Sequence, residues 1–121
     1  MLNLNSFLLS SEGPKKLVDF YKQVLACGPK RVDGEYSVFD TGACALVIGP
    51  HSKVQGQNRN PERIILNFET NEVKGEFERI KALGAKVIAE PYSMGDDPDF
   101  LIATLADPDG NYFQLISPMK T

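Results

Sequence analysis

Histidine and cysteine, two common residues of catalytic and metal sites, are scarce in this sequence. There is one histidine, His51, and there are two cysteines, Cys27 and Cys44, with 16 residues between them. No third or fourth cysteine completes a zinc-binding pattern, so two reduced thiols are the simplest interpretation. His51 follows Pro50 at the start of a polar segment, where we expect an exposed loop residue.

Glu69 is the one carboxylate that we consider as a general base. It ends the apolar stretch RIILNFE, which predicts a strand over residues 63–69. A charged residue at the end of a strand is usually solvated. The sequence therefore assigns no catalytic residue beyond this candidate.

Two amide side chains, Asn67 and Gln114, are expected in the middle of strands, where a buried polar group needs a partner. Each offers a donor and an acceptor, which suits hydrogen bonding to a neutral polar ligand. That the two amides bond to each other or to water is an equally good interpretation. Tyr112 lies two residues before Gln114 and therefore shares its face of the strand.

The elements that position these residues are predicted by periodicity. In the first half, Leu2, Leu4 and Leu8 alternate with polar residues, which predicts a strand whose leucines face the core. Asn5 and Phe7 would then lie on the opposite face. Apolar residues at spacings of three and four predict a helix over residues 15–28 that ends at Gly28, and strands are expected over 36–40 and 43–50.

The second half begins the same order of elements again. After the strand that ends at Glu69, apolar spacing predicts a helix over 71–85, with Asn71 as its N-cap and Gly84 as its C-cap. A strand over 86–91 follows, then the polar segment PYSMGDDPDF, and a hairpin that turns at Pro108-Asp109-Gly110.

The two halves can be aligned with each other. Cys27 to Lys30 matches Leu83 to Lys86, and Gly42 to Pro50 matches Gly110 to Pro118. We therefore predict an α+β fold of two βαβββ modules within one domain, with module one at 1–50, a linker at 51–61 and module two at 62–121. Residues 91–100 enlarge only the second copy and are a candidate lid.

Composition and charge exclude several classes of function. The net charge is −3 and the pI is near 5.1, with no dense basic surface, which argues against nucleic-acid binding. No apolar run approaches the roughly 20 residues that span a bilayer. The first residues lack a basic region and a cleavage site, so we expect no signal peptide, no membrane partner and a cytoplasmic location.

The chain resembles the vicinal oxygen chelate superfamily, which includes glyoxalase I, extradiol dioxygenases and bleomycin-resistance proteins. The segments LVDFYKQVL, LADPDGNYFQL and LNFETNEVKGEFERIKALGAKV carry the resemblance. It implies curved mixed sheets that form a cup, with the helices outside. It also implies a homodimer in which modules of two chains build the cups at their interface.

In metal-dependent members of this superfamily, His and Glu side chains from four strands hold one divalent ion. By the resemblance, these positions correspond here to Asn5 (or Ser6 if the first strand shifts by one residue), Leu46, Ile65 and Gln114. Leu46 is placed by the internal repeat, as the counterpart of Gln114. Two aliphatic groups and two neutral amides are poor ligands for a divalent metal. We therefore expect no metal and no cofactor, the alternative being one divalent metal at a displaced site.

The leading hypothesis is metal-independent binding of a small amphipathic molecule in a cup at the dimer interface. Apolar and aromatic walls with a few polar groups are typical of such pockets. The expected ligand-binding residues are Asn5, Asn67, Tyr92, Phe100, Tyr112 and Gln114. The alternative is a glyoxalase-like lyase, isomerase or dioxygenase with a displaced or weak metal site or with Glu69 as a base. A regulatory or scaffold dimer without a ligand is the third hypothesis.

Overall fold

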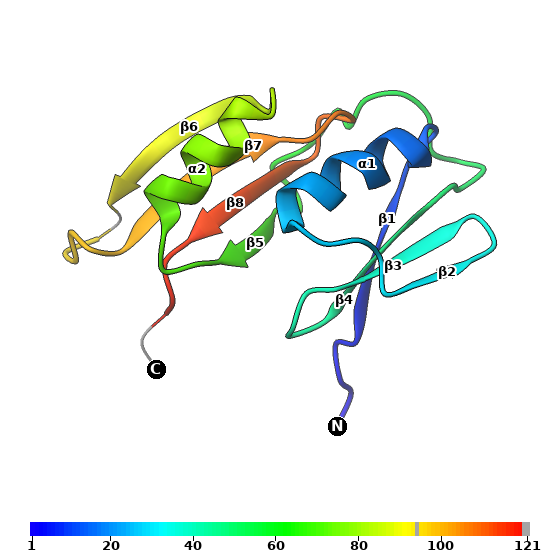
Figure 1. Cartoon of the computed structure of the whole chain (residues 1–121), viewed down its shortest axis with the longest axis horizontal. Helices are drawn as coiled ribbons and strands as arrows, with labels where there is room; N and C mark the ends of the chain where they lie inside the picture. Colours follow the sequence, from blue (N-terminus) through cyan, green and yellow to red (C-terminus); the bar gives the residue numbers. More distant parts are fainter. Residues whose placement is uncertain (94, 120–121) are drawn as a thin grey trace. The chain divides into compact units, whose positions relative to one another are not determined.

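The chain forms two compact units, one from Met1 to Gly56 and one from Gln57 onward, in a computed structural model that describes residues 1–93 and 95–119. Each unit has one helix and one four-stranded mixed sheet, so the predicted α+β fold of two βαβββ modules is confirmed (Figure 1). The boundary between the units falls inside the polar segment 51–61.

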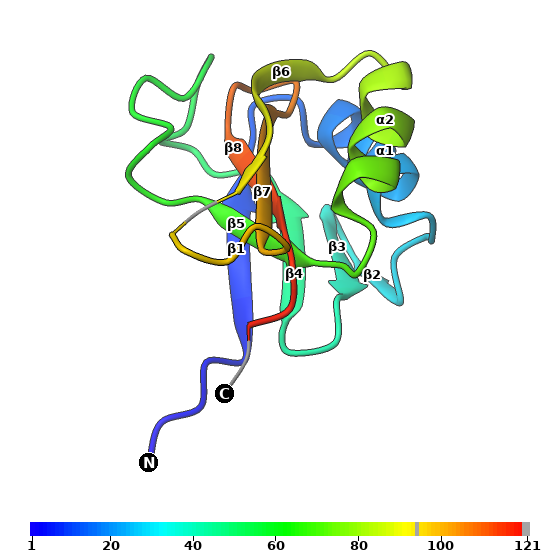
Figure 2. The ribbon, with the colours of Figure 1, turned by 90° about the vertical axis from the view of Figure 1, so that its left-hand side faces the viewer.

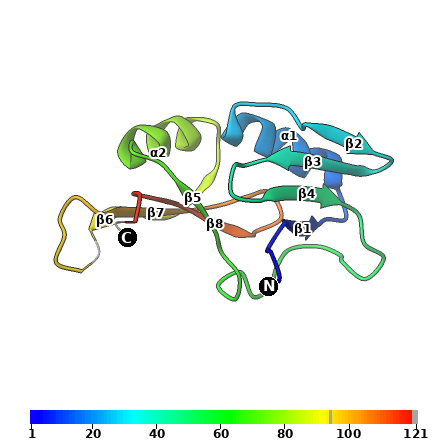
Figure 3. The same ribbon diagram turned by 90° about the horizontal axis from the view of Figure 1, so that it is seen from below.

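The first unit has its strands in the order β1-β4-β3-β2, with β1 parallel to β4 and the other pairs antiparallel (Figure 3). Its elements are β1 (Ser6–Ser10), α1 (Pro14–Leu25), β2 (Arg31–Asp33), β3 (Tyr36–Asp40) and β4 (Ala45–Gly49).

One face of this sheet is covered by α1. Pro14 occupies the first turn of the helix, where a missing N–H costs nothing. The helix buries Leu17, Tyr21 and Val24, and the sheet buries Phe39, Leu46 and Ile48 on alternate positions. Burial of each large apolar side chain contributes about 1.5–3 kcal/mol.

The second unit repeats this arrangement with the strand order β5-β8-β7-β6 and a parallel β5–β8 pair. Its helix lies on one side of the sheet (Figure 2). Its elements are β5 (Leu66–Glu69), α2 (Val73–Ala82), β6 (Lys86–Ser93), β7 (Leu101–Ala106) and β8 (Tyr112–Ile116).

The core of the second unit lies between α2 and the face of the sheet that carries Phe113 and Leu115. The helix buries Val73, Phe77 and Ile80, as its apolar spacing predicts. On the sheet side, the rings of Phe68 and Phe113 meet edge to face with centroids 6.0 Å apart. The opposite face of this sheet is not covered by α2 and is called the open face below.

The first strand differs from its prediction. Leu2, Leu4 and Leu8 are 98%, 69% and 54% exposed, so their expected inward orientation is wrong. The strand begins only at Ser6, and Phe7 pairs in register with the buried Leu46 on the helix-covered face. The alternating leucines predicted a strand from Leu2 onward, but Leu2 and Leu4 lie before the first residue of β1.

In the structure, the last strands of the two modules align one residue away from the alignment predicted from the sequence. The backbone N–H of Ser11 donates to Gly49 O, and that of Thr70 donates to Ile116 O, at the same place in each module. Counting back two residues makes Val47, and not Leu46, the counterpart of Gln114. The sequence alignment matched Gly42 with Gly110, but the loop 41–44 is one residue shorter than the turn 107–111. A shift of one residue reverses the face of a strand.

Smaller differences concern helix ends and one strand. Helix α1 ends at Leu25, before a left-handed Ala26 with φ 56°, rather than at Gly28. The N-cap position of α2 is Glu72 instead of Asn71. Strand β2 was not predicted, although the Asp33-Gly34 pair at its end is a strong hairpin signal.

The closing turn, residues 107–111, is organised by one buried carboxylate. Asp107 is 5% exposed, and its Oδ1 accepts the backbone N–H groups of Asp109 and Asn111 at 2.9 and 3.0 Å. Outside the turn, Gln57 Nε2 donates to Pro108 O at 2.8 Å, and Asn58 N–H donates to Asp109 O. The start of the second unit is thereby fixed to the hairpin that ends it.

Of the helices in the part of the chain that the structure describes, none is long and apolar enough to cross a membrane.

Replacing Asp107 by Ala should destabilise the second unit by about 1–3 kcal/mol, because at least two partly buried N–H groups would lose their acceptor. Asp109→Ala is the matched control and should change the unfolding free energy by less than about 0.5 kcal/mol. Urea unfolding followed by circular dichroism measures both values. Equal effects of the two substitutions would contradict this role of Asp107.

Candidate functional site

Three polar side chains lie side by side on the open face of the second sheet. Strand register places Asn67 on β5 opposite Gln114 on β8, and Gln114 opposite Thr104 on β7. Because neighbouring strands are about 4.8 Å apart, these residues form a continuous line across three strands. We call Asn67, Gln114 and Thr104 the polar row.

A hydrogen bond fixes the centre of the polar row. Gln114 Nε2 donates to Thr104 Oγ1 at 3.0 Å, so the amide is bonded to a hydroxyl and not to its neighbour Asn67. Thr104 is 5% exposed, Gln114 is half-buried and Asn67 is exposed. The row therefore runs from a buried anchor to a solvent-exposed amide.

Thr104 was missed by sequence reasoning. In the strand LIATLAD it lies two residues from both Ile102 and Ala106, so all three share one face. A polar residue at such a position in an otherwise apolar strand needs a partner. That rule, already applied to Gln114, also applies to Thr104.

The polar row lies between apolar residues. On one side, Tyr112 of β8 is paired with Ala106 of β7. On the other side, Ile116 of β8 is paired with Ile102 of β7, and Tyr92 of β6 is the next register partner. The open face thus has one line of hydrogen-bonding groups with apolar surface above and below it.

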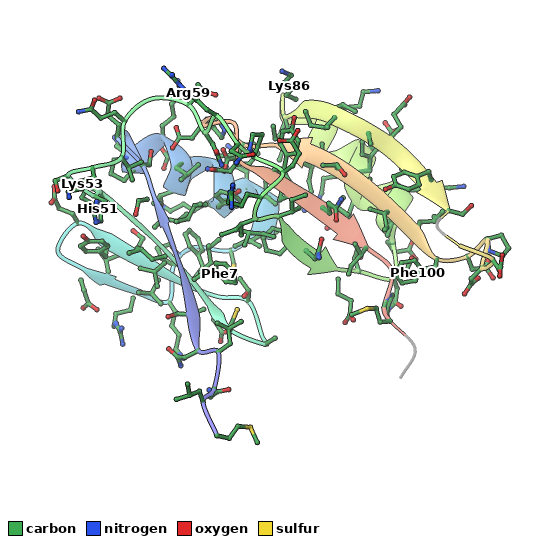
Figure 4. The ribbon with its side chains drawn as sticks, turned by 180° about the vertical axis from the view of Figure 1, so that it is seen from behind. Phe7, His51, Lys53, Arg59, Lys86 and Phe100 are labelled. Atoms are coloured by element: carbon green, nitrogen blue, oxygen red, sulfur yellow. The ribbon has the colours of Figure 1, made fainter. Side chains whose placement is uncertain are left out.

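Charged side chains on this face lie at its margins. Glu69 is the last residue of β5 and is exposed, opposite Ile116. Lys86 is the first residue of the edge strand β6, opposite Ala106 (Figure 4). The polar row itself carries no charge.

The corresponding positions of the first unit are apolar. Leu8 is paired with Val47, and Val47 with Val38, in the register that the polar row has in the second unit. We call these three residues the apolar row. Leu8 is 54% exposed, and Val47 and Val38 are partly exposed. The two modules therefore share a backbone pattern, but at these positions the first unit has apolar side chains and the second has polar ones.

This register shows where Asn5 and Ser6 lie relative to the first strand. Ser6 belongs to β1, where it alternates with Phe7 and so shares the face of Leu8. Asn5 precedes the strand and is exposed, and its carbonyl accepts the N–H of Ala45 at 2.9 Å. A role of Asn5 in ligand binding stays a prediction.

In the first unit, Tyr36 begins β3 on the face that carries the apolar row. Its ring lies against Gly49, where any side chain would collide with it. Its hydroxyl donates to Pro50 O at 2.9 Å. Gly49 thus provides the space that this aromatic ring fills.

The candidate lid meets the second sheet at Phe100, which is half-buried just before β7 (Figure 4). The Ser117 hydroxyl donates to Asp99 O at 3.3 Å and accepts the N–H of Leu101 at 3.0 Å. Ser117 therefore attaches the end of this segment to the end of β8. Residue 94, which belongs to the predicted lid, lies outside the described residues.

His51 is exposed in the loop after β4, as expected, and Lys53 lies close to it in this loop (Figure 4). The Nδ1 atom of His51 accepts the backbone N–H of Lys53 at 3.1 Å. The imidazole therefore takes part in a local turn.

The side chains of the open face do not fit a divalent metal. Where the superfamily's metal enzymes require imidazole or carboxylate, the polar row offers two neutral amides and a hydroxyl. The nitrogen of Gln114 is also directed at Thr104. Among the residues that the structure describes, no three His, Cys, Asp or Glu side chains are grouped so that they could hold a metal ion.

Comparison with protein families agrees with this architecture. A family model described as a glyoxalase-like domain matches residues 6–116. The chain belongs to this glyoxalase-like family. It is thereby a member of the vicinal oxygen chelate superfamily, as the sequence motifs predict.

Solved structures of the superfamily share the fold. A glyoxalase-related enzyme from Fulvimarina pelagi has a TM-score of 0.79 at 16% identity, covering 98% of this chain and 89% of its own. A glyoxalase/bleomycin resistance protein/dioxygenase family enzyme from Burkholderia phytofirmans PsJN has a TM-score of 0.77 at 20% identity, covering 98% and 100%.

A glyoxalase/bleomycin resistance protein from Albidiferax ferrireducens T118 is also similar, with a TM-score of 0.73 at 18% identity over 95% of this chain and 98% of its own. At such identities the likeness establishes the fold alone. A search of curated proteins found no match to this glyoxalase-like chain.

Proposed function

We propose that this glyoxalase-like protein binds a small amphipathic molecule without a metal. The observation that carries the proposal is the polar row between apolar residues on the open face of the second sheet. A few fixed polar groups within apolar walls are the usual composition of a small-molecule site. Tyr112 and Tyr92 add aromatic surface on the same face.

The proposal favours ligand recognition over metal catalysis because the Gln114 side chain is a neutral amide that is already hydrogen-bonded to Thr104. A metal ligand must direct a lone pair at the ion, and a carboxylate does this with a negative charge. The Gln114 amide is neutral, and its N–H is already bonded to Thr104. Its carbonyl oxygen is suited to accept a hydrogen bond from an organic molecule.

We further propose that two copies pair, so that each cup is built from modules of both chains. The apolar row supports this, since Leu8 is 54% exposed in a face that a soluble monomer would leave in water. In such a cup an amphipathic ligand would use the polar row for its polar group. Two free cysteines agree with a reducing, cytoplasmic location.

A second candidate function is an enzyme of the lyase, isomerase or dioxygenase type. Two structurally similar proteins are described as enzymes, and Glu69 is an exposed carboxylate at the end of β5 on the open face. In this case Glu69 would move a proton and Gln114 would only position the substrate. Turnover that is lost in Glu69→Gln but kept in Gln114→Ala would favour this candidate.

The dimer can be tested by size-exclusion chromatography with light scattering. We expect a mass of twice 13.4 kDa. Leu8→Glu should shift the protein toward the monomer, because a charge in a buried interface is costly. A single 13.4 kDa species for the unaltered protein would contradict the dimer.

Ligand binding can be tested by a thermal-shift screen of amphipathic metabolites, in the presence and absence of a chelator. A ligand that binds only the native state should raise the melting temperature by mass action. We expect hits that persist with chelator and are lost in Gln114→Ala. Glu78→Ala, a change on the exposed surface of α2, should keep them. Hits that all require a divalent metal would contradict the proposal.

A further inference from the structure

We infer that the polar row recognises a neutral amide group, of the carboxamide or lactam kind, attached to an apolar ring. This inference rests on the proposed function and adds the chemical class of the ligand. It depends on which donors and acceptors of the polar row are already hydrogen-bonded within the protein and which are available to a ligand.

The first step concerns the direction of the Gln114 side chain. Because Gln114 Nε2 donates to Thr104 Oγ1 at 3.0 Å, one amide hydrogen is committed and the rotation of the carboxamide is restricted. Thr104 is only 5% exposed and cannot itself be reached over much of its surface. It acts as a positioning residue, and the acceptor that it orients is Gln114 Oε1.

The second step concerns Asn67. It lies opposite Gln114 on the neighbouring parallel strand and is exposed. Its amide supplies both a donor and an acceptor on the strand next to that of Gln114, and the backbones of adjacent strands are about 4.8 Å apart. A ligand that spans the two strands therefore meets a fixed acceptor and, beside it, a donor.

An amide group complements this pair. Its N–H can donate to Gln114 Oε1 while its carbonyl oxygen accepts from Asn67 Nδ2. A carboxylate has no hydrogen for Gln114 and would place a negative charge where the row offers no cation. The one cation that register places on this face, Lys86, lies at the start of the edge strand, two strands away from Gln114. An ester has an acceptor but no donor.

The apolar residues beside the row define the rest of the ligand. Tyr112 and Ala106 lie on one side, and Ile116 and Ile102 on the other. Ile102 and Ala106 are buried, so a flat apolar ring next to the amide would contact the half-buried Tyr112 or Ile116 while the amide meets the row. Benzamide has this combination and is the probe of choice.

Three probes that share one benzoyl group separate the contributions. Benzamide has a donor and an acceptor, N,N-dimethylbenzamide keeps only the acceptor, and benzoate is an anion. Titrations followed by two-dimensional nitrogen–proton NMR report the side-chain NH₂ signals of Gln114 and Asn67. We expect benzamide to shift both signals and to bind about tenfold more tightly than either analogue, the loss expected for one hydrogen bond.

Variants of Thr104 test the positioning. In Thr104→Val the side chain keeps its shape but cannot accept from Gln114, so the preference for benzamide over N,N-dimethylbenzamide should fall to about twofold or less. Thr104→Ser keeps the hydroxyl and should retain the preference. A merely structural role of Thr104 would change stability and leave the preference unaltered, which would overturn its assignment as a positioning residue.

Two results would overturn the amide class. One is binding of benzoate or N,N-dimethylbenzamide that equals that of benzamide, and the other is an absence of shifts at Gln114 and Asn67 with millimolar benzamide. If a hit from the thermal-shift screen then moves these signals, the proposed function stands and only the amide class falls. If no compound shifts the Gln114 and Asn67 signals, both the proposed function and the amide class are wrong.

Discussion

The parallel pairing of β5 with β8 is the constraint on which the open face depends. It brings Asn67 beside Gln114, although the two residues are far apart in the sequence. Parallel strands cannot be joined by a tight turn, and here α2, β6 and β7 lie between the two strands in the chain. Antiparallel pairing of β7 with β8 then adds Thr104 to the same line. The three polar groups lie side by side because β8, the last strand of the module, pairs with both β5 and β7.

The two modules use one backbone plan for different chemistry. At equivalent register positions the first unit has Leu8, Val47 and Val38, and the second has the polar row. The closing turn, held by Asp107 and by contacts from Gln57 and Asn58, belongs to the frame and would be needed for any function. At these register positions the two modules therefore share one backbone pattern and differ in their side chains.

Much of this fold could be predicted from the sequence, because helix periodicity and turn residues are local signals. The open face of the second sheet was also predictable, since Asn67 and Gln114 interrupt apolar strands. The first strand was not, because Leu2 and Leu4 alternate in a segment that no partner strand orders. Leu46 was assigned to the wrong face by a loop that is one residue shorter in one module. The Gln114–Thr104 bond depends on strand register, which single-strand patterns do not specify.

A crystal structure of the protein purified without chelators, with diffraction data collected to reveal anomalous scattering, tests the central claim most directly. We predict electron density for an organic molecule in hydrogen-bonding distance of Gln114 and Asn67, with no anomalous peak beside them. A peak about 2.0–2.2 Å from the Gln114 side-chain oxygen, the distance of a transition-metal ligand, would contradict metal-independent recognition.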